Sequence, residues 1–219
     1  MKTNLWPSPA SITNITEHQR STITTSLAGP FGLLCGVPGA GKTFTAAAIV
    51  RAIIADQGVG SVGVCAPTGK AAVRITEGLQ ANGIGMEATT IHRLLGVNRA
   101  GYDGKGWGFS FGPTRPLPYR YILVDEPSML DCSLAASLFS ACSPGTHVLL
   151  TGDPNQLPPV GAGAPLRDFI AAGLPCGTLT EIKRNSGTIT EACRAIREGR
   201  KAIPDARIDI SSGKNWLHL

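Results

Sequence analysis

The stretch Gly36-Val37-Pro38-Gly39-Ala40-Gly41-Lys42-Thr43 fits the pattern G-x-x-x-x-G-K-[ST]. A short apolar run, 31–35, precedes it, and an Ala- and Ile-rich run without a breaker, 44–55, follows it. These flanks predict a buried strand before the stretch and a buried helix after it. Glycines let the backbone turn its N–H groups toward a phosphate, and a helix N-terminus adds partial positive charge there. The stretch therefore predicts a phosphate-binding loop rather than a glycine-rich turn with a chance lysine.

The loop carries the residue types that hold a nucleotide and its metal ion. Lys42 is expected to reach the β- and γ-phosphates, and the Thr43 hydroxyl is expected to bind Mg²⁺. The residues expected to contact the nucleotide are Gly36, Pro38, Gly39, Ala40, Gly41, Lys42 and Thr43.

A glutamine precedes the loop in a predicted helix. Asn14 is expected to cap this helix, with Glu17 as its capping-box partner. The amide of Gln19 offers both a donor and an acceptor, which suits the edge of an adenine ring. Considered alone, Gln19 fits an ordinary surface glutamine better than an adenine contact.

Composition indicates a folded domain that crosses no membrane. Among 219 residues, 42% are hydrophobic and only 16% are charged, which excludes a disordered chain. The formal net charge of +5 permits a polyanionic partner without requiring one. The six cysteines show neither C-x-x-C nor zinc-site spacing, which predicts buried, reduced thiols in a cytoplasmic protein. No apolar run reaches the ~18 residues of a membrane span, and the N-terminus has no signal-like apolar core.

Predicted strands and helices alternate along the chain, which favours an α/β fold with a mainly parallel sheet flanked by helices. The segment 1–13 is expected to be a loose lead-in. Further strands are predicted at 61–66, 119–124, 147–151 and 176–182, and further helices at 128–141, 165–172 and 186–199.

Polar groups follow two of the predicted strands, where open α/β sheets bind their ligands. Asp125 and Glu126 end one strand, and adjacent carboxylates there are costly unless they meet water or a cation. In a nucleotide hydrolase the first would hold Mg²⁺ and the second would orient or deprotonate the attacking water. Gln156 follows the next strand, where it can sense the γ-phosphate or bind the same water.

Three segments are candidates for nucleic-acid contact, each with a plainer alternative. The turn containing Pro67, Thr68 and Lys70 can hold a phosphate or simply begin a helix. His92 is either a packed histidine or a nucleic-acid contact, and lacks a second ligand for a metal site. The insertion 98–118, which contains Trp107, predicts a β-hairpin whose aromatic side chains either stack on bases or pack the hairpin onto the domain.

Taken in order, these stretches resemble superfamily 1 helicases, in particular the RecD-like 5′→3′ branch (superfamily 1B). The resemblance covers residues 15–200 and therefore nearly the whole chain. The matching motifs are Gln19, the loop Gly36 to Thr43, the stretch 66–72, the stretch 90–95, Asp125-Glu126-Pro127-Ser128-Met129, the stretch 152–160 and Arg184. Pro127 stands where an alanine is usual, and Asn185 stands where a glutamine usually follows the arginine.

The resemblance implies a RecA-like ATPase lobe over 14–97 and 119–199 that uses ATP and Mg²⁺. It implies that Arg184 approaches the γ-phosphate and that Pro67, Thr68, Lys70 and His92 touch single-stranded DNA. It also places the 98–118 hairpin as a pin at a duplex junction, with other replication or recombination proteins as further partners.

In that family ATP closes between two lobes, and 200–219 is expected to begin the connection to a second lobe missing from this chain. The sequence therefore predicts a helicase motor lobe that turns over ATP weakly by itself. The alternatives are a nucleotide- or DNA-binding module of a nuclease–helicase complex, and another P-loop ATPase such as a clamp loader. The stretch around Gln156 argues against the clamp loader.

Overall fold

The computed structural model describes residues 6–98, 108–181, 195–196 and 199–200. Its centre is a six-stranded sheet in the order β3-β2-β6-β7-β1-β8, with every neighbouring pair parallel. The strands are β1 (Phe31–Gly36), β2 (Val62–Ala66), β3 (Thr89–Thr90), β6 (Tyr121–Asp125), β7 (His147–Gly152) and β8 (Cys176–Leu179). The predicted α/β fold with a parallel sheet is confirmed.

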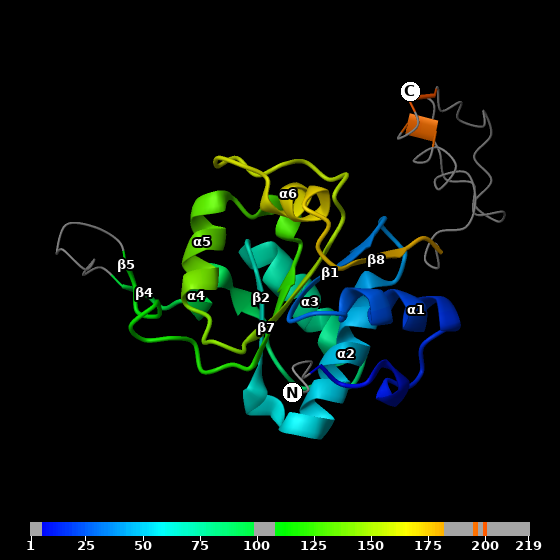
Figure 1. The fold of residues 1–219 in the computed structure, drawn as a ribbon, viewed down its shortest axis with the longest axis horizontal. Coiled ribbons are helices and arrows are strands. Elements are labelled where there is room, and N and C mark those ends of the chain that lie inside the picture. The colour runs from blue at the N-terminus through cyan, green and yellow to red at the C-terminus, as the bar shows by residue number, and fades with distance from the viewer. Residues whose placement is uncertain (1–5, 99–107, 182–194, 197–198, 201–219) are drawn as a thin grey trace.

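Helices cover both faces of this sheet (Figure 1). The helices are α1 (Glu17–Ser26), α2 (Lys42–Gln57), α3 (Gly69–Ala81), α4 (Ile91–Leu94), α5 (Cys132–Ser140) and α6 (Pro165–Ala171). Short 3₁₀ turns occur at η1 (Pro9–Ser11), η2 (Val59–Ser61) and η3 (Pro127–Met129). Among the described helices, none is long and apolar enough to cross a membrane.

The strands are buried on both faces, and alternate side chains feed two separate cores. In β6, Tyr121 and Leu123 join a core that contains residues of α1, α2 and α3. Ile122 and Val124 point to the opposite face and join a core with residues of α4, α5 and α6. Because successive strand residues face opposite sides, a continuous apolar run supplies both cores.

The first half of the predicted insertion contains an antiparallel pair of short strands. Strand β4 (Val97–Asn98) pairs antiparallel with β5 (Gly108–Phe109), and Val97 lies opposite Phe109. Figure 1 shows this pair beyond α4, on the side away from α1. The predicted stacking residue Trp107 lies outside the described residues, so its role stays a prediction.

The N-terminal segment, expected to be loose, contributes to the core. The Trp6 side chain is 8% exposed, and its ring centroid lies 5.3 Å from that of Tyr121. Its Nε1 donates a hydrogen bond to the Gly29 carbonyl oxygen at 2.8 Å, and Ile12 is fully buried. Single apolar residues among prolines carry no periodic signal, so sequence reasoning missed this packing.

The first helix begins two residues later than predicted. Thr16 caps α1, not Asn14, and Gln19 completes the capping box in place of Glu17. Asn14 instead adopts a left-handed backbone, with φ of 59°. A Ser/Thr cap followed three residues later by Glu or Gln defines this motif, and Thr16 with Gln19 satisfies that spacing.

Two other predicted elements are shorter in the structure. The helix predicted at 128–141 is preceded by η3 and starts at Cys132, because the Asp131 carboxylate accepts a hydrogen bond from the Leu134 N–H at 2.8 Å. The last strand ends at Leu179, and the Thr180 N–H donates to His18 Nε2 at 3.1 Å.

The predicted burial of the cysteines is wrong for Cys132, which is exposed on α5. Most of the helix predicted at 186–199 lies outside the described residues.

Candidate nucleotide-binding site

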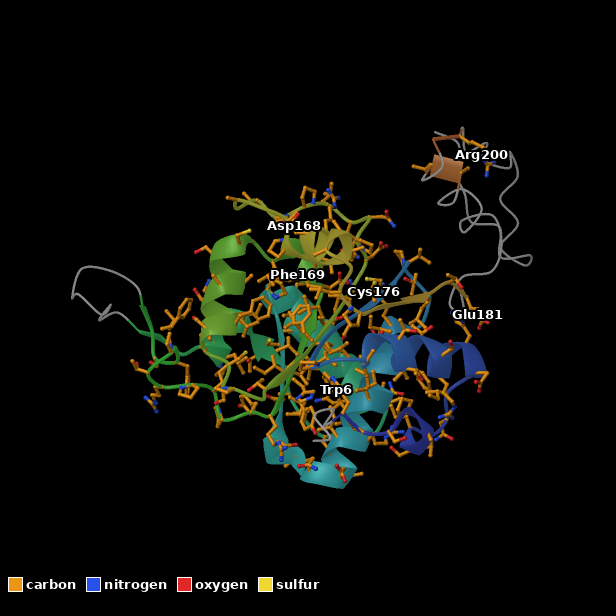
Figure 2. All side chains as sticks on the ribbon, viewed as in Figure 1. Trp6, Asp168, Phe169, Cys176, Glu181 and Arg200 are labelled. Atoms are coloured by element: carbon orange, nitrogen blue, oxygen red, sulfur yellow. The ribbon has the colours of Figure 1, made fainter. Side chains whose placement is uncertain are left out.

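The order of the strands brings the predicted site residues to one edge of the sheet. Strand β7 lies between β1 and β6, with Cys35 opposite Gly152 and Asp125 opposite Thr151. Because all three strands are parallel, the phosphate loop and the two carboxylates lie at the same side of the sheet, where these strands have their carboxyl ends. Figure 1 labels β1 and β7 in the central sheet, and Figure 2 adds the side chains around them.

The phosphate loop has the backbone its sequence predicts. Gly39 and Gly41 have φ of 83° and 85°, in the left-handed region where a side chain is strained. The Lys42 ammonium folds back over the loop and donates to the carbonyl oxygens of Gly36 at 2.7 Å and Val37 at 3.3 Å. A phosphate is a stronger acceptor than these neutral carbonyls, so Lys42 is placed to exchange them for an anionic ligand.

Gln19 is buried behind this loop. Its side chain is 2% exposed, its Oε1 accepts from the Thr16 N–H at 2.9 Å, and its Nε2 donates to Thr45 Oγ1 at 3.0 Å. Thr45 in turn donates to the Gly41 carbonyl oxygen at 3.0 Å. The surface alternative for Gln19 is therefore wrong, because the amide joins the first helix to the phosphate loop. Its Nε2 keeps one further donor, so adenine contact stays a prediction.

Asp125 is a buried carboxylate at the end of β6. It is 7% exposed, and the Thr151 hydroxyl donates to its Oδ1 at 2.7 Å. Burial, helped by the neighbouring charge of Glu126 and opposed by the Thr151 hydrogen bond, raises the pKa of Asp125 from 3.8 to about 6. A cation at this position would favour the charged form and reverse the shift.

Glu126 is strained and has an unpaired oxygen. Its φ is 52°, one of two positive values outside glycine among the described residues. Its N–H donates to the Thr151 carbonyl oxygen at 3.0 Å, but its buried Oε2 has no hydrogen-bond partner in the described part of the chain. Both features cost free energy, and such costs concentrate at functional sites. The side chain is therefore placed to accept a hydrogen bond from a ligand or water.

The segment after β7 connects to the carboxylates through η3. Ser128 Oγ donates to Gln156 Oε1 at 3.1 Å, and Ser128 follows Glu126 by two residues. Arg167 in α6 donates from Nε to the Pro154 carbonyl oxygen and from a terminal nitrogen to that of Gln156, both at 3.2 Å. Gln156 is thus held against η3, the turn that follows the carboxylates, whereas Arg184 lies outside the described residues.

Sequence reasoning missed Thr151, Ser128 and Arg167. Each is a common polar residue in a helix, turn or strand, and only the spatial neighbours distinguish it. The position of Thr151 at the carboxyl end of an apolar strand was an available signal, since polar groups there face ligands.

The predicted DNA contacts gather at the carboxyl end of β2 and β3, where Ala66 lies opposite Thr90. Thr68 caps α3 by accepting from the Ala71 N–H at 3.3 Å, so the plainer alternative of a helix start is observed. Lys70 and His92 are exposed, and Pro67 is half-buried. The His92 ring lies 5.8 Å from the Phe109 ring and so links α4 to the hairpin.

The parallel sheet, the phosphate loop at the end of β1 and the carboxylates at the end of β6 define a P-loop nucleotide hydrolase of the RecA-like kind. The chain belongs to the family described as AAA domain, whose model matches residues 14–219. Its relatives place it in the RecD-like branch of superfamily 1B, as the motifs predict.

Two curated relatives illustrate this membership. The ATP-dependent RecD2 DNA helicase of Deinococcus radiodurans is 36% identical over 94% of this chain and 27% of the relative. The RecBCD enzyme subunit RecD of Mycolicibacterium smegmatis is 36% identical over 92% of this chain and 39% of the relative. The chain therefore spans less than half the length of either relative.

A solved structure has the same fold. The Pif1 helicase from Candida albicans superposes with a TM-score of 0.59 at 22% identity, covering 85% of this chain and 44% of that protein.

Proposed function

We propose that the chain is the motor lobe of an ATP-dependent DNA helicase. It binds Mg-ATP and single-stranded DNA, and in the full-length protein it couples ATP hydrolysis to 5′→3′ translocation. The observation that carries the proposal is the unpaired, buried Oε2 of Glu126, at the same sheet edge as the phosphate loop. The direction of translocation rests only on the resemblance of the motifs to the RecD-like branch.

The residues present fit a magnesium ion. The Thr43 hydroxyl and the Asp125 carboxylate are hard oxygen donors, which Mg²⁺ prefers, and Mg²⁺ usually takes few protein ligands beside substrate phosphates. Burial raises the pKa of Asp125, and a cation bound beside this carboxyl group would lower it again. Thr43 and Asp125 would hold the ion, which would supply positive charge to offset the charge that develops during phosphoryl transfer.

The chain's own residues divide the remaining work. Lys42 binds the β- and γ-phosphates in place of the loop carbonyls. Glu126 orients the attacking water and accepts its proton at Oε2, because no other described group occupies that oxygen. Gln156, which follows β7 and is hydrogen-bonded to Ser128, senses the γ-phosphate. Arg184 is proposed to approach the γ-phosphate.

The DNA face of the lobe is proposed at Pro67, Thr68, Lys70 and His92. Lys70 and His92 are exposed at one end of the sheet, which supports a phosphate-backbone contact. Trp107, which directly precedes β5 in the sequence, is proposed to meet the duplex junction.

The test is ATP hydrolysis and fluorescent-nucleotide binding by this chain, with and without single-stranded DNA. Lys42→Ala should weaken nucleotide binding, because the phosphates lose their cation. Glu126→Gln should retain binding and abolish hydrolysis, because the amide accepts no proton. Equal loss of binding in both variants would contradict the proposed division of roles.

A second candidate is a nucleotide- or DNA-binding module of a larger nuclease–helicase complex with little activity of its own. The name of one relative, the RecBCD enzyme subunit RecD, favours it. DNA-stimulated turnover that Lys42→Ala abolishes selects the motor. Mg-ATP binding without turnover by this chain fits a half-motor that needs its second lobe as well as the module, and turnover by the full-length protein then selects the motor.

A further inference from the structure

Helix α3 contains a glycine where its own stability argues against one. Gly78 lies in the interior of α3, and a glycine there costs roughly 0.5–1 kcal/mol relative to alanine. Its backbone has no positive φ that would demand glycine. The reason for Gly78 must therefore lie in what surrounds it.

The neighbour that meets Gly78 is Thr43 of the phosphate loop. A Cβ added to Gly78 would lie 2.2 Å from Thr43 Cγ2 and 3.6 Å from Thr43 Cβ. Apart from the backbone of α3 itself and the adjoining residues, no other described atom would come within 4 Å. A carbon–carbon contact of 2.2 Å does not occur in proteins, so an added methyl group would displace the Thr43 side chain.

Displacing the Thr43 methyl group also moves its hydroxyl group. Cγ2 and Oγ1 are both attached to Cβ, so one torsion angle, χ1, sets the direction of each. Thr43 is the second residue of α2, whose backbone is held by the helix, so rotation about χ1 is the available response. A methyl group excluded from its place against α3 would turn the hydroxyl to another direction.

We propose that Gly78 is a positioning residue for Thr43. By having no side chain, it accommodates the Thr43 methyl against α3 and holds the hydroxyl in the rotamer that binds Mg²⁺. The inference rests on the proposed function, because it takes Thr43 as a magnesium ligand.

The sharpest test combines Gly78→Ala with Thr43→Ser. Serine retains the hydroxyl, as the motif permits, and lacks the methyl group that a Cβ at position 78 would strike. Binding of a fluorescent ATP analogue is titrated with Mg²⁺ and in EDTA, for wild type, both single variants and the double variant. Gly85→Ala is the control, because a Cβ there would have no neighbour within 4 Å.

Gly78→Ala should lower magnesium-dependent nucleotide affinity by about tenfold or more, as loss of a supporting contact to a metal ligand commonly does. It should leave affinity in EDTA unchanged. In the Thr43→Ser background, Gly78→Ala should lower magnesium-dependent affinity much less. A similar loss in both backgrounds, an equal loss in EDTA, or no loss would overturn the proposal.

Thermal unfolding without nucleotide or metal tests the steric contact separately. The melting temperature should change less favourably on Gly78→Ala when position 43 is threonine than when it is serine. If Gly78→Ala alone does not fold, recovery of folding in the double variant shows the same contact. A wild-type chain without magnesium-enhanced nucleotide binding would refute the proposed function and the role of Gly78 in it, while the melting temperatures would still report the contact.

Discussion

The substitution Asp125→Asn tests how far the buried, ionised carboxylate lowers the free energy of unfolding, separately from its proposed role in binding Mg²⁺. Asp125 is 7% exposed, and burial is the main cause of its raised pKa of about 6, against an ordinary 3.8. At pH 8 the carboxyl group is ionised in both the folded and the unfolded chain. Since the folded pKa is the higher one, ionisation opposes folding, and this cost disappears as pH falls below both values.

The pKa values set the size of the effect. A tenfold change in proton affinity corresponds to about 1.4 kcal/mol, so ionised Asp125 lowers the free energy of unfolding by about 3 kcal/mol at pH 8. At pH 5 the folded carboxyl is mostly protonated, and the cost falls to about half that value. An asparagine cannot ionise, so its own packing cost is independent of pH.

The assay is urea unfolding of wild type and Asp125→Asn without Mg²⁺ at pH 8 and pH 5. The stability of the variant relative to wild type should fall by about 1–2 kcal/mol from pH 8 to pH 5. At pH 8, Mg-ATP should stabilise wild type by mass action more than it stabilises the variant. A relative stability that stays constant with pH would refute the argument that burial raises the pKa of this carboxyl group.

Three further predictions concern the packing of Trp6, the hydrogen bond from Thr151 to Asp125, and the reactivity of two cysteines. Trp6→Ala should lower the free energy of unfolding by about 3–5 kcal/mol because it empties a core position, whereas Val59→Ala at an exposed position should change it little; urea unfolding that shows equal effects would exclude a core role. Thr151→Val removes the hydrogen bond that stabilises ionised Asp125, so nucleotide binding should require more Mg²⁺ at pH 6 than in wild type, and an unchanged magnesium titration would count against that bond. The Cys176 sulfur lies 3.4 Å from that of Cys35, and this hydrogen bond lowers the Cys176 pKa, whereas burial raises that of Cys142 to about 11. Alkylation by iodoacetamide, followed by peptide mass spectrometry, should therefore begin at lower pH at Cys176 than at Cys142, and identical profiles would contradict the predicted difference.

The sequence alone determined the fold class and the nucleotide loop. The loop from Gly36 to Thr43 can be recognised because its function needs particular residues at fixed spacing along the chain. The strand ending at Asp125 and Glu126 is recognisable for a similar reason, since carboxylates seldom end an apolar run by chance. Both signals depend only on residues close together in the sequence, so they can be recognised without knowing the tertiary structure.

Tertiary structure decided which residues meet. The capping box of Thr16 and Gln19 was visible in the sequence, yet only the packed helix shows that the Gln19 amide is buried against Thr45. The bond from Thr151 to Asp125 depends on strand order, and the contact of Gly78 with Thr43 depends on the approach of α3 to α2. Spacing along the chain carries no record of strand order or helix packing, because both follow from how the two cores are filled as a whole.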